Sequence, residues 1–432
     1  MSEWTSTSLE QLADITSGGT PSRNVDEYWN GGIYWVTPTD ITACNTNFLF
    51  STKESITKAG LASSSAKQLA KGTLLFTSRA TIGEIKIAAA PVSTNQGFKN
   101  LSPKPNIDGI FLFYQIQRLK NQFLKYAAGS TFLEINRKDI GRVKIPHPSK
   151  NTIQNKIGEI LQNLDHTIEK TEALIKKYQQ IKAGLMHDLF TRGITADGKL
   201  RPPREQAPEL YQETPIGWIP RDWTPSTLRP CLIDNPTNGV YKPAELIGEG
   251  ALMVGQTAFT KERSVDFSLC RRGQVTDDEL RQYGIAKNNI LVTRVFATVD
   301  GVGLPTLVPD VPEPSVYESN MMRLRVAPDV LVPRLLFEWL RSPKARNYIL
   351  TNANASNQVS VNQVVLNKLP VSLMNEDEQR KIVIVIEKND KKIADEKDNL
   401  SKLKQMKSGL MHDLLTGKVQ VNVDQSETIH AT

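Results

Sequence analysis

GLMHDL, from Gly184 to Leu189, occurs a second time from Gly409 to Leu414, 225 residues further along a chain of 432 residues. Six identical residues in the same order are hard to attribute to chance, so the chain contains an internal repeat. With the same offset, the segments before the two hexapeptides align without a gap, apolar position on apolar position. The two segments are therefore two copies of one structural unit.

The aligned apolar positions advance by threes and fours, which is typical of a long amphipathic helix. In the first copy they are Ile157, Ile160, Leu161, Ile168, Ile175, Tyr178, Ile181, Leu185 and Leu189, and in the second copy they are Ile382, Val385, Ile386, Ile393, Leu400, Leu403, Met406, Leu410 and Leu414. A helix of about 40 residues is about 60 Å long. A stripe this narrow needs another helix against it, so the sequence predicts that the two copies form a coiled coil.

The predicted seam of this coiled coil has polar interruptions. Leu164 aligns with Asn389, and Thr171 aligns with Glu396. A polar seam residue can fix the register of two helices at a cost in stability, but it can also be a tolerated defect. The sequence leaves both alternatives open.

The segments that precede the two helices resemble each other more weakly. LLFTSRATIG (Leu74 to Gly83) is echoed by ILVTRVFATVDGVG (Ile290 to Gly303), and Asn95 is echoed by Asn320. The chain therefore reads domain, helix, domain, helix. The predicted boundaries are 1–150 for the first domain, 151–192 for the first helix, 193–212 for a linker, 213–374 for the second domain, 375–417 for the second helix and 418–432 for a C-terminal tail.

Local patterns within these segments predict a mixed α/β (α+β) fold with an undetermined topology. Runs at Leu74 to Thr77, Ile85 to Ala89 and Ile290 to Thr293 predict short strands, and Ile110 to Tyr126 and Pro333 to Leu350 predict helices. Between the halves, Arg192 to about Gln212 is rich in proline, glycine and charge. That composition predicts an exposed linker.

Composition excludes several classes of protein. Hydrophobic residues make up 39% of the chain and charged residues 23%, which is enough apolar material for globular cores. No run of about 18 apolar residues occurs, and MSEWTSTSLE has no signal-peptide pattern, so we expect a cytoplasmic protein without a membrane span. Cys44, Cys231 and Cys270 are widely spaced and odd in number, which predicts buried thiols rather than disulfides or a zinc site.

The distribution of charge favours DNA binding by the domains rather than by the helices. The net charge is +7, and residues 1–150 hold 17 Lys and Arg against 11 Asp and Glu. In residues 205–375, 12 of the 17 basic residues are Arg, which suits bidentate contacts with guanine and phosphate. Residues 151–190 hold 5 basic and 5 acidic residues, so a solvated or partner-facing surface is expected there.

Motifs for catalysis are missing from the sequence. Asp234-Asn235-Pro236-Thr237 comes closest to the Asn-Pro-Pro-aromatic motif of adenine methyltransferases, but it lacks the second proline and the aromatic residue. No GxxxxGK[ST] phosphate loop occurs, and the five histidines show no metal-ligand spacing. We therefore expect no catalytic residues, no metal site and no cofactor bound by this chain.

Two unlike α/β domains, each followed by a long helix that ends in GLMHDL and LFTRGI or LLTGKV, resemble the specificity subunits of Type I restriction–modification systems. The resemblance covers nearly the whole chain. It is sharpest in the two repeats and in GWIPRDWTPSTL (Gly217 to Leu228), and it extends to YWVTPTDI (Tyr34 to Ile41) and STFLEINRKDIGRVKIPHP (Ser130 to Pro148).

This resemblance implies a function in recognition. In that family the globular domains are target recognition domains, and the two helices pair antiparallel as a spacer and as a dock for two methyltransferase subunits. A restriction subunit then joins the assembly. The resemblance thus implies double-stranded DNA, methyltransferase subunits and restriction subunits as partners, with S-adenosylmethionine, ATP and magnesium bound by those partners.

Residue chemistry supplies the candidates for DNA contact, because Arg and Lys suit guanine or phosphate, and Asn and Gln suit adenine. All are expected in polar loops beside predicted strands. They are Arg79, Lys86, Asn95, Gln96 and Lys99 in the first domain, and Arg271, Arg272, Arg294, Asn320 and Arg323 in the second. A structural role stays open for each. Two other functions also stay open: a self-contained DNA methyltransferase with divergent motifs, and a coiled-coil scaffold that does not bind DNA.

Overall fold

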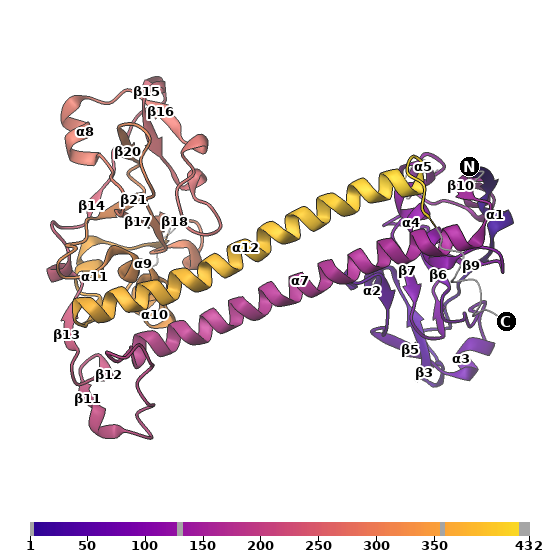
Figure 1. Cartoon of the computed structure of the whole chain (residues 1–432), viewed down its shortest axis with the longest axis horizontal. Coiled ribbons are helices and arrows are strands. Elements are labelled where there is room, and N and C mark those ends of the chain that lie inside the picture. Colours follow the sequence, from indigo (N-terminus) through magenta and orange to yellow (C-terminus); the bar gives the residue numbers. More distant parts are fainter. Residues whose placement is uncertain (1–3, 128–132, 355–358, 423–432) are drawn as a thin grey trace. The chain divides into compact units, whose positions relative to one another are not determined.

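The structure, a computed structural model, describes residues 4–127, 133–354 and 359–422. It divides into two compact units, one of residues 1–175 with 395–432 and one of residues 176–394. Each unit holds one globular domain together with part of α7 (Asn151–Thr191) and part of α12 (Glu376–Leu415), which are the two long helices (Figure 1). Two predicted segments lie partly outside the described residues. These are residues 130–132 at the start of the segment Ser130 to Pro148, and residues 423–432 of the predicted C-terminal tail.

The first domain contains a five-stranded sheet in the order β2-β9-β6-β7-β4 and a three-stranded sheet in the order β5-β3-β8. A separate pair, β1 with β10, joins the start of the domain to its end. The strands are β1 (Trp4–Ser8), β2 (Ala13–Ser17), β3 (Trp29–Val36), β4 (Phe48–Leu49), β5 (Glu54–Ile56), β6 (Leu74–Thr77), β7 (Ile85–Ala88), β8 (Val92–Thr94), β9 (Phe98–Pro103) and β10 (Lys144–Pro148). The helices are α1 (Leu9–Leu12), α2 (Pro38–Ala43), α3 (Lys58–Ala62), α4 (Gly109–Arg118), α5 (Lys120–Lys125) and α6 (Arg137–Arg142).

The second domain repeats this plan with a four-stranded sheet, β14-β21-β17-β19, and a three-stranded sheet, β16-β15-β20. Here β13 pairs with β23, as β1 pairs with β10. The strands are β11 (Tyr211–Thr214), β12 (Gly217–Pro220), β13 (Thr224–Thr227), β14 (Thr237–Asn238), β15 (Ile247–Val254), β16 (Arg271–Gly273), β17 (Ile290–Thr293), β18 (Val295–Phe296), β19 (Pro305–Leu307), β20 (Ser315–Tyr317), β21 (Met321–Leu324), β22 (Val359–Ser360) and β23 (Pro370–Leu373). The helices are α8 (Asp277–Tyr283), α9 (Pro333–Arg341), α10 (Pro343–Thr351) and α11 (Gln363–Asn367).

The fold is thus a mixed α/β (α+β) internal repeat. In each three-stranded sheet the long central strand has one antiparallel and one parallel neighbour, β5 and β8 beside β3, and β16 and β20 beside β15. The predicted strands at Leu74–Thr77 and Ile290–Thr293 are present with those bounds. The strand predicted at Ile85 to Ala89 ends at Ala88.

The prediction of one continuous helix was wrong in two places. Ile110 to Tyr126 is divided into α4 and α5 at Leu119, whose backbone leaves the helical region and whose side chain is buried in the core. Pro333 to Leu350 is divided into α9 and α10 at Ser342. Pro343 follows Ser342, and a proline ring cannot sit inside a helix without displacing the preceding turn.

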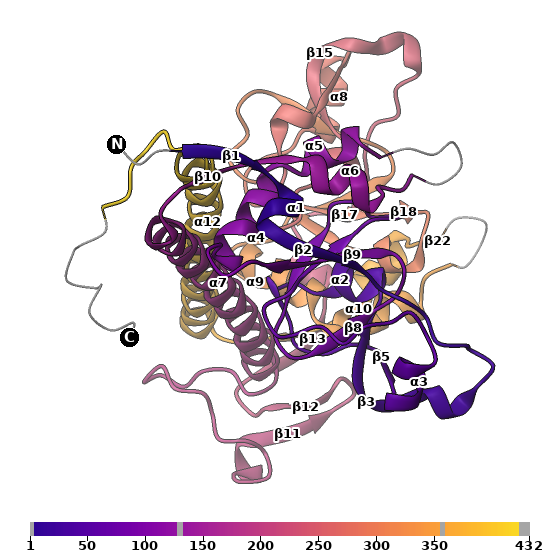
Figure 2. The ribbon, with the colours of Figure 1, turned by 90° about the vertical axis from the view of Figure 1, so that its right-hand side faces the viewer.

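Each domain core is completed by the beginning of one long helix and the end of the other. In the first unit, Ile157 and Leu161 near the start of α7 and Leu414 and Leu415 at the end of α12 belong to the same apolar core. Figure 2 shows β1 beside that end of α12. In the second unit, Leu189 at the end of α7 joins Ile382, Val383 and Ile386 near the start of α12. The two helices therefore run antiparallel within each unit.

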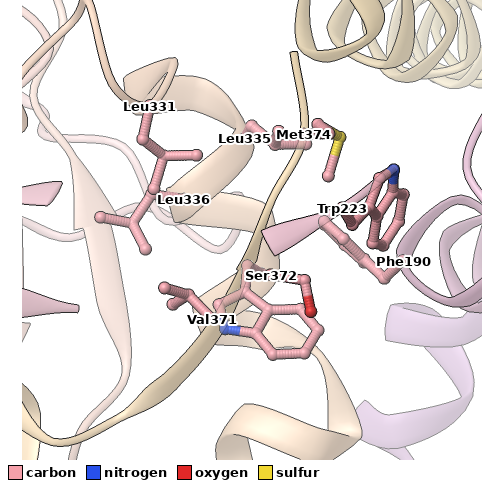
Figure 3. A pocket seen from close by; sticks show the side chains of 9 residues that line it. Phe190, Trp223, Leu331, Leu335, Leu336, Val371, Ser372 and Met374 are labelled. Carbon is pink, nitrogen blue, oxygen red and sulfur yellow. The ribbon is translucent and has the colours of Figure 1, made fainter. Parts of the chain in front are cut away.

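The end of α7 is anchored by aromatic packing in the second domain. Phe190 lies beside Trp223, Leu335 and Met374 around a small apolar pocket (Figure 3), and its ring meets Trp339 edge-on at a centroid distance of 5.3 Å. β23 provides part of the same wall through Val371 and Ser372. This end of α7 is therefore part of the domain and not a projecting rod.

Predicted seam positions differ in their burial. Ile157, Leu161, Ile168, Ile175, Ile382, Ile386 and Ile393 are buried, whereas Leu164, Tyr178, Leu185, Asn389, Leu400, Leu403 and Leu410 are half-buried. The prediction was wrong for Ile181 and Met406, whose side chains are 46% and 54% exposed. The neighbouring Lys182 and Lys407 point inward instead, because each meets a carboxylate of the opposite helix.

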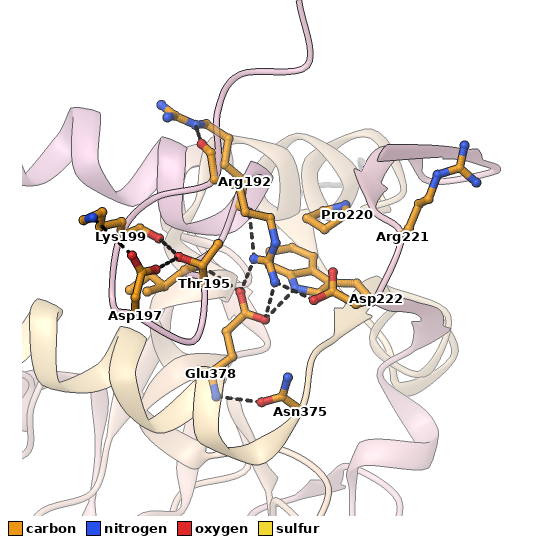
Figure 4. A network of polar contacts seen from close by, with 12 residues as sticks. Arg192, Thr195, Asp197, Lys199, Pro220, Arg221, Asp222, Asn375 and Glu378 are labelled. Carbon is orange, nitrogen blue, oxygen red and sulfur yellow. Dashed lines mark hydrogen bonds and ion pairs between the residues drawn. The ribbon is translucent and has the colours of Figure 1, made fainter. Parts of the chain in front are cut away.

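The segment 193–212, predicted to be an exposed linker, is only partly exposed. Arg201 is only 6% exposed, and Ile194, Ala207 and Tyr211 are buried. The Arg201 guanidinium donates to both carboxylate oxygens of Glu378, at the first turn of α12, and pairs with Asp222 (Figure 4). Burial lowers the pKa of Arg201, whereas its contacts with Glu378 and Asp222 raise it. Together these contacts outweigh burial, so the pKa lies above the usual value. A buried ion pair, invisible to composition, holds the segment in place.

Candidate nucleic-acid interface

In the first domain, two of the predicted DNA contacts converge on one carboxylate. Arg79 follows β6 in the turn before β7, and its Nε lies 2.9 Å from Oε2 of Glu134. Lys99, on β9, places Nζ 3.6 Å from Oε1 of the same side chain. The Arg79 side chain is 47% exposed, so its guanidinium can reach a ligand while it stays near Glu134.

Lys99 was predicted to lie in a polar loop, and that prediction was wrong. It occupies β9, only 8% of its side chain is exposed, and Nζ lies 3.5 Å from the Ser78 hydroxyl. Burial lowers the pKa of the Lys99 ammonium, although Glu134 acts in the opposite direction. Lys99 therefore supports the turn that carries Arg79 and is too enclosed to read a base.

The other first-domain candidates make local contacts. Lys86, on β7 and not in a loop as predicted, donates to the Thr46 carbonyl at 2.6 Å. Asn95 accepts from the Gly97 backbone N–H at 2.9 Å, which shapes the turn before β9. Gln96 is exposed and accepts from the Thr20 hydroxyl. Of these three, Gln96 is the residue with a side chain open to solvent.

In the second domain, three predicted contacts gather around residues 318–320, just before β21. Arg271, on β16, pairs with Glu318 and is 60% exposed. The Nε of Arg294 donates to the Ser319 carbonyl at 3.1 Å, and its backbone N–H donates to the Asn320 carbonyl at 2.9 Å. The side-chain oxygen of Asn320 is buried without a hydrogen-bond partner among the described residues. This turn thus brings two arginines and an amide together.

Arg272 and Arg323 lie apart from this turn. Arg272, 43% exposed, forms a 2.6 Å ion pair with Glu313. Arg323 lies on β21, 6% exposed, and donates to the backbone carbonyls of Gly284 and Gln282. The prediction that Arg271, Arg272 and Arg323 lie in loops was wrong, and the Arg323 side chain is buried on its strand.

The two candidate surfaces occupy equivalent places in the repeat. Thr77 on β6 pairs with Phe98, and Thr293 on β17 pairs with Met321. Immediately beyond, the N–H of Ser78 bonds to the Gly97 carbonyl and that of Arg294 bonds to the Asn320 carbonyl. Asn320 therefore corresponds to Gly97, and the sequence echo between Asn95 and Asn320 was misaligned by two residues.

Two glutamines that sequence reasoning missed tie each long helix to its domain. Gln154 accepts from the Asp108 N–H at 3.0 Å and donates to the Pro148 carbonyl at 3.0 Å. Gln379 accepts from the Val332 N–H at 2.8 Å and donates to the Met374 carbonyl at 2.9 Å. The sequence did contain a signal for these two residues. Gln154 and Gln379 are identical at the 225-residue offset, whereas most polar residues around them differ between the two copies.

The remaining expectations about sites concern thiols, metals and membranes. Cys231 is buried, whereas Cys44 and Cys270 are half-buried, and all three are free thiols. Among the described residues, the structure shows no group of three or more His, Cys, Asp or Glu side chains placed to hold a metal ion. Within the same residues, no helix combines the length and apolarity needed to cross a bilayer.

Known proteins of one family are similar to this chain in sequence. Residues 1–180 match the family model of the Type I restriction modification DNA specificity domain. The Type I restriction enzyme MjaIX specificity subunit of Methanocaldococcus jannaschii is 32% identical over 222 residues, which span 50% of this chain and 50% of that subunit. The MjaVIII specificity subunit of the same organism is 23% identical over 356 residues, 81% of this chain and 79% of that subunit.

Solved structures share the fold at low sequence identity. The S subunit of a Type I restriction–modification system from M. genitalium has a TM-score of 0.56 and 15% identity, with 98% of this chain and 97% of that chain covered. A chain from a structural study of the assembly and conformational transition of the type I R-M system has a TM-score of 0.59 and 16% identity, with 96% and 98% covered. Residues 1–180 are therefore similar to the Type I restriction modification DNA specificity domain, and the chain is similar in sequence and fold to Type I specificity subunits.

Proposed function

We propose that this chain is the DNA-specificity subunit of a Type I restriction–modification complex. Each domain would read one half of a bipartite, asymmetric target in double-stranded DNA. The observation that carries this proposal is the repeat of two equivalent folds with different surface residues, each completed by the ends of both long helices. Two unlike readers joined in one chain suit two unlike half-sites, as half-site spacing mirrors protein geometry in other DNA-binding proteins.

The long helices would set the unread gap between the half-sites. α7 has 41 residues and α12 has 40, so each helix alone is about 60 Å long. A paired helix of that length changes its span in steps of about 1.5 Å per residue. Its length can therefore act as a ruler along the duplex.

Catalysis would reside in other subunits of the complex. Two methyltransferase subunits would dock on the helices and supply S-adenosylmethionine, and restriction subunits would supply ATP- and magnesium-dependent cleavage. The relatives named above are specificity subunits, and the chain has no methyltransferase or phosphate-loop motif. Such a complex acts on cellular DNA, so we place it in the cytoplasm.

We propose that the exposed candidates, together with those in the turn before β21, contact DNA. Arg79, Gln96, Arg271 and Arg272 keep exposed side chains, and Arg294 and Asn320 lie in the turn beside Arg271. Arg79→Gln is expected to weaken binding by about 1–3 kcal/mol if Arg79 contacts a base. If Arg79 contacts only phosphate, the loss of affinity is the same for all DNA sequences, and the complex releases about one counterion fewer on binding.

The decisive experiment maps methylated adenines in a host that carries this chain with its methyltransferase. The proposal predicts one bipartite motif with a fixed gap, and loss of that motif when this chain is deleted. Methyl transfer by the purified chain alone would establish the self-contained methyltransferase instead. No sequence-specific gel shift, even with methyltransferase subunits present, would establish the scaffold.

The ruler is tested by matched insertions in both helices. Thr171 lies six residues beyond Asp165, and Ser401 lies six residues before Lys407, which faces Asp165. Seven residues inserted after Thr171 and seven before Ser401 add about 10 Å to both helices. The methylated motif should keep both half-sites and gain a few base pairs of gap, and an unchanged gap would refute the ruler.

A further inference from the structure

Two ion pairs between the long helices occupy equivalent positions in the repeat. Nζ of Lys407 lies 2.6 Å from Oδ1 of Asp165 in the first unit, and Nζ of Lys182 lies 2.5 Å from Oδ1 of Asp390 in the second. Asp165 and Asp390 are 225 residues apart, and so are Lys182 and Lys407. Each long helix therefore contributes the Asp to one of these ion pairs and the Lys to the other.

In the first unit, the carboxylate also holds the globular domain. The Tyr114 hydroxyl of α4 donates to Oδ2 of Asp165 at 2.7 Å, and the Asn47 amide donates to the same oxygen at 2.6 Å. Lys407 lies over the Tyr114 ring, 5.7 Å from its centroid. Only 11% of the Asp165 side chain is exposed, so α7, α12 and the domain share one buried carboxylate.

In the second unit, the same place is filled by different chemistry. Asp390 accepts from Lys182 of α7 and from Arg334 of α9, the latter at 2.5 Å. Arg334 and Lys182 also reach Glu338, which is 4% exposed, at 2.6 and 3.7 Å. Again one carboxylate of a long helix joins the other long helix to the domain.

Tyr114 and Glu338 occupy corresponding positions in their domains. Each lies six residues beyond the residue whose backbone N–H is held by the equivalent glutamine, Asp108 by Gln154 and Val332 by Gln379. We name these two sites the junctions: Asp165, Lys407, Tyr114 and Asn47 form the first, and Asp390, Lys182, Arg334 and Glu338 form the second.

The junctions lie where the helices leave the domain cores. Ile157 and Leu161 precede Asp165 and belong to the first core, whereas Ile168 and Ile175 follow it and are buried without belonging to either core. Beyond Asp165, the ion pair between Glu172 and Lys404, at 2.7 Å, joins the two helices alone. Within the described part of the first unit, this junction is thus the last polar contact shared by both helices and the domain.

We propose that the two junctions are positioning sites that fix the angle at which each domain sits on the helix pair. Apolar packing is non-directional, but a carboxylate with two or three hydrogen-bond donors has a defined orientation. The consequence for DNA rests on the proposed function: one extra base pair rotates a half-site by about 35° and moves it by about 3.4 Å. A domain free to rock on its helices would lose the ability to discriminate such a step.

The first test needs no DNA. Spin labels are attached at Lys125→Cys on α5 and Ser401→Cys on α12, both exposed and in the first unit, after the native cysteines are replaced in the full chain. Lys407→Gln is expected to broaden the distance distribution at least twofold. Lys404→Gln is the matched control, because it removes the same charge from the same helix at a site whose ion pair, with Glu172, joins the two helices and involves no described residue of the domain. Its distribution should stay narrow. An unchanged width in Lys407→Gln overturns the proposal.

The second test measures spacing discrimination in the complex with methyltransferase. Affinities are compared for duplexes with the mapped gap and with gaps one base pair longer or shorter. Lys407→Gln is expected to reduce the preference for the correct gap at least fivefold while it changes binding to one half-site less than twofold; Lys404→Gln should keep the preference. A lowered melting temperature with full spacing preference would assign the junction a structural role only. If the wild-type chain shows no preference, the proposed function fails, and the spin-label widths still decide the junction.

Discussion

Replacement of Glu378 by alanine is the sharpest test of how the 193–212 segment is held. Glu378 is 3% exposed and accepts from four donors: two guanidinium nitrogens of Arg201, the Ile194 backbone N–H at 2.8 Å and the Trp223 indole N–H at 3.1 Å. In Glu378→Ala, Arg201 stays buried with only Asp222 as a carboxylate partner. The network thus loses its central acceptor.

The expected magnitude follows from burial. Removal of one partner from a buried ion pair costs about 3–5 kcal/mol, because the other charge is left uncompensated. Orphaned N–H groups cost about 1–3 kcal/mol each, but these terms overlap within one network and do not add. We expect a loss of about 4 kcal/mol in the free energy of unfolding. For a unit of this size, that lowers the melting temperature by roughly 10 °C.

The assay is thermal and urea unfolding of the full chain, followed by tryptophan fluorescence, which reports on Trp223. Glu376→Ala is the matched control: Glu376 lies in the same first turn of α12 and pairs with Arg380, but both side chains are more than half exposed. That substitution should cost less than about 1 kcal/mol. A loss below about 1.5 kcal/mol for Glu378→Ala, or equal losses for both variants, would refute the reasoning.

Three further predictions concern packing and thiol chemistry. Gly193 has a φ of +66°, and a Cβ there would lie 2.1 Å from Glu378 Oε1 and 2.4 Å from the Trp223 ring. Gly193→Ala should therefore lower the free energy of unfolding by about 2 kcal/mol or more, on the order of other strained sites. The control Gly184→Ala, in helix α7 with open space around it, should raise the free energy of unfolding by about 0.5–1 kcal/mol in the same melts. Gln115 is buried and donates to the carbonyls of Pro146 and Leu415 at 2.7 Å each. Gln115→Ala should lower the free energy of unfolding by about 1–3 kcal/mol and increase amide hydrogen exchange at the end of α12. Unchanged exchange there would contradict this prediction. Burial raises the pKa of Cys231 to about 11, so at pH 8 about one thiol in 1000 is ionised and iodoacetamide should label Cys231 only after unfolding; rapid labelling of the native chain would count against this burial.

The sequence predicted the long helices because their repeat is visible twice, apolar residue on apolar residue. It failed where a single polar contact outweighs composition. Arg201 sits in a stretch rich in proline and glycine, yet one buried carboxylate 177 positions later holds it. Lys99 and Arg323 look like ligands for DNA by residue type, but strand register turns both side chains inward.

The junction residues were missed for a related reason. Asp165 follows Leu164 directly, and an isolated charge beside an apolar seam position is usually a solvated outer residue. The structure reverses the two, with Asp165 8% exposed and Leu164 half-buried. Among the residues that the structure describes, the polar interruptions at Asn389 and Thr171 form side-chain hydrogen bonds within their own helices, to the carbonyls of Val385 and Thr167. The two equivalent cross-helix ion pairs lie one or more residues away, at the Asp and Lys positions identical in both copies.

The GLMHDL hexapeptide shows what packing explains and what it does not. Its Leu, Met and second Leu contact the domain cores in both copies, through Leu185, Met186 and Leu189 and through Leu410, Met411 and Leu414. Its Asp forms an ion pair near the helix end in both copies, Asp188 with Arg192 and Asp413 with Lys418.

The Gly and His of the hexapeptide are exposed in both copies, and a Cβ at Gly184 or Gly409 would meet no described atom within 4 Å. Core packing therefore does not explain why the Gly and His are identical in both copies. Binding of the same partner at two places would explain it, because two copies of a methyltransferase subunit on a pseudo-symmetric chain would each contact the same residues. Under the proposed function, the identity of these exposed positions reflects a repeated binding partner, and the identity of the leucines reflects a repeated fold.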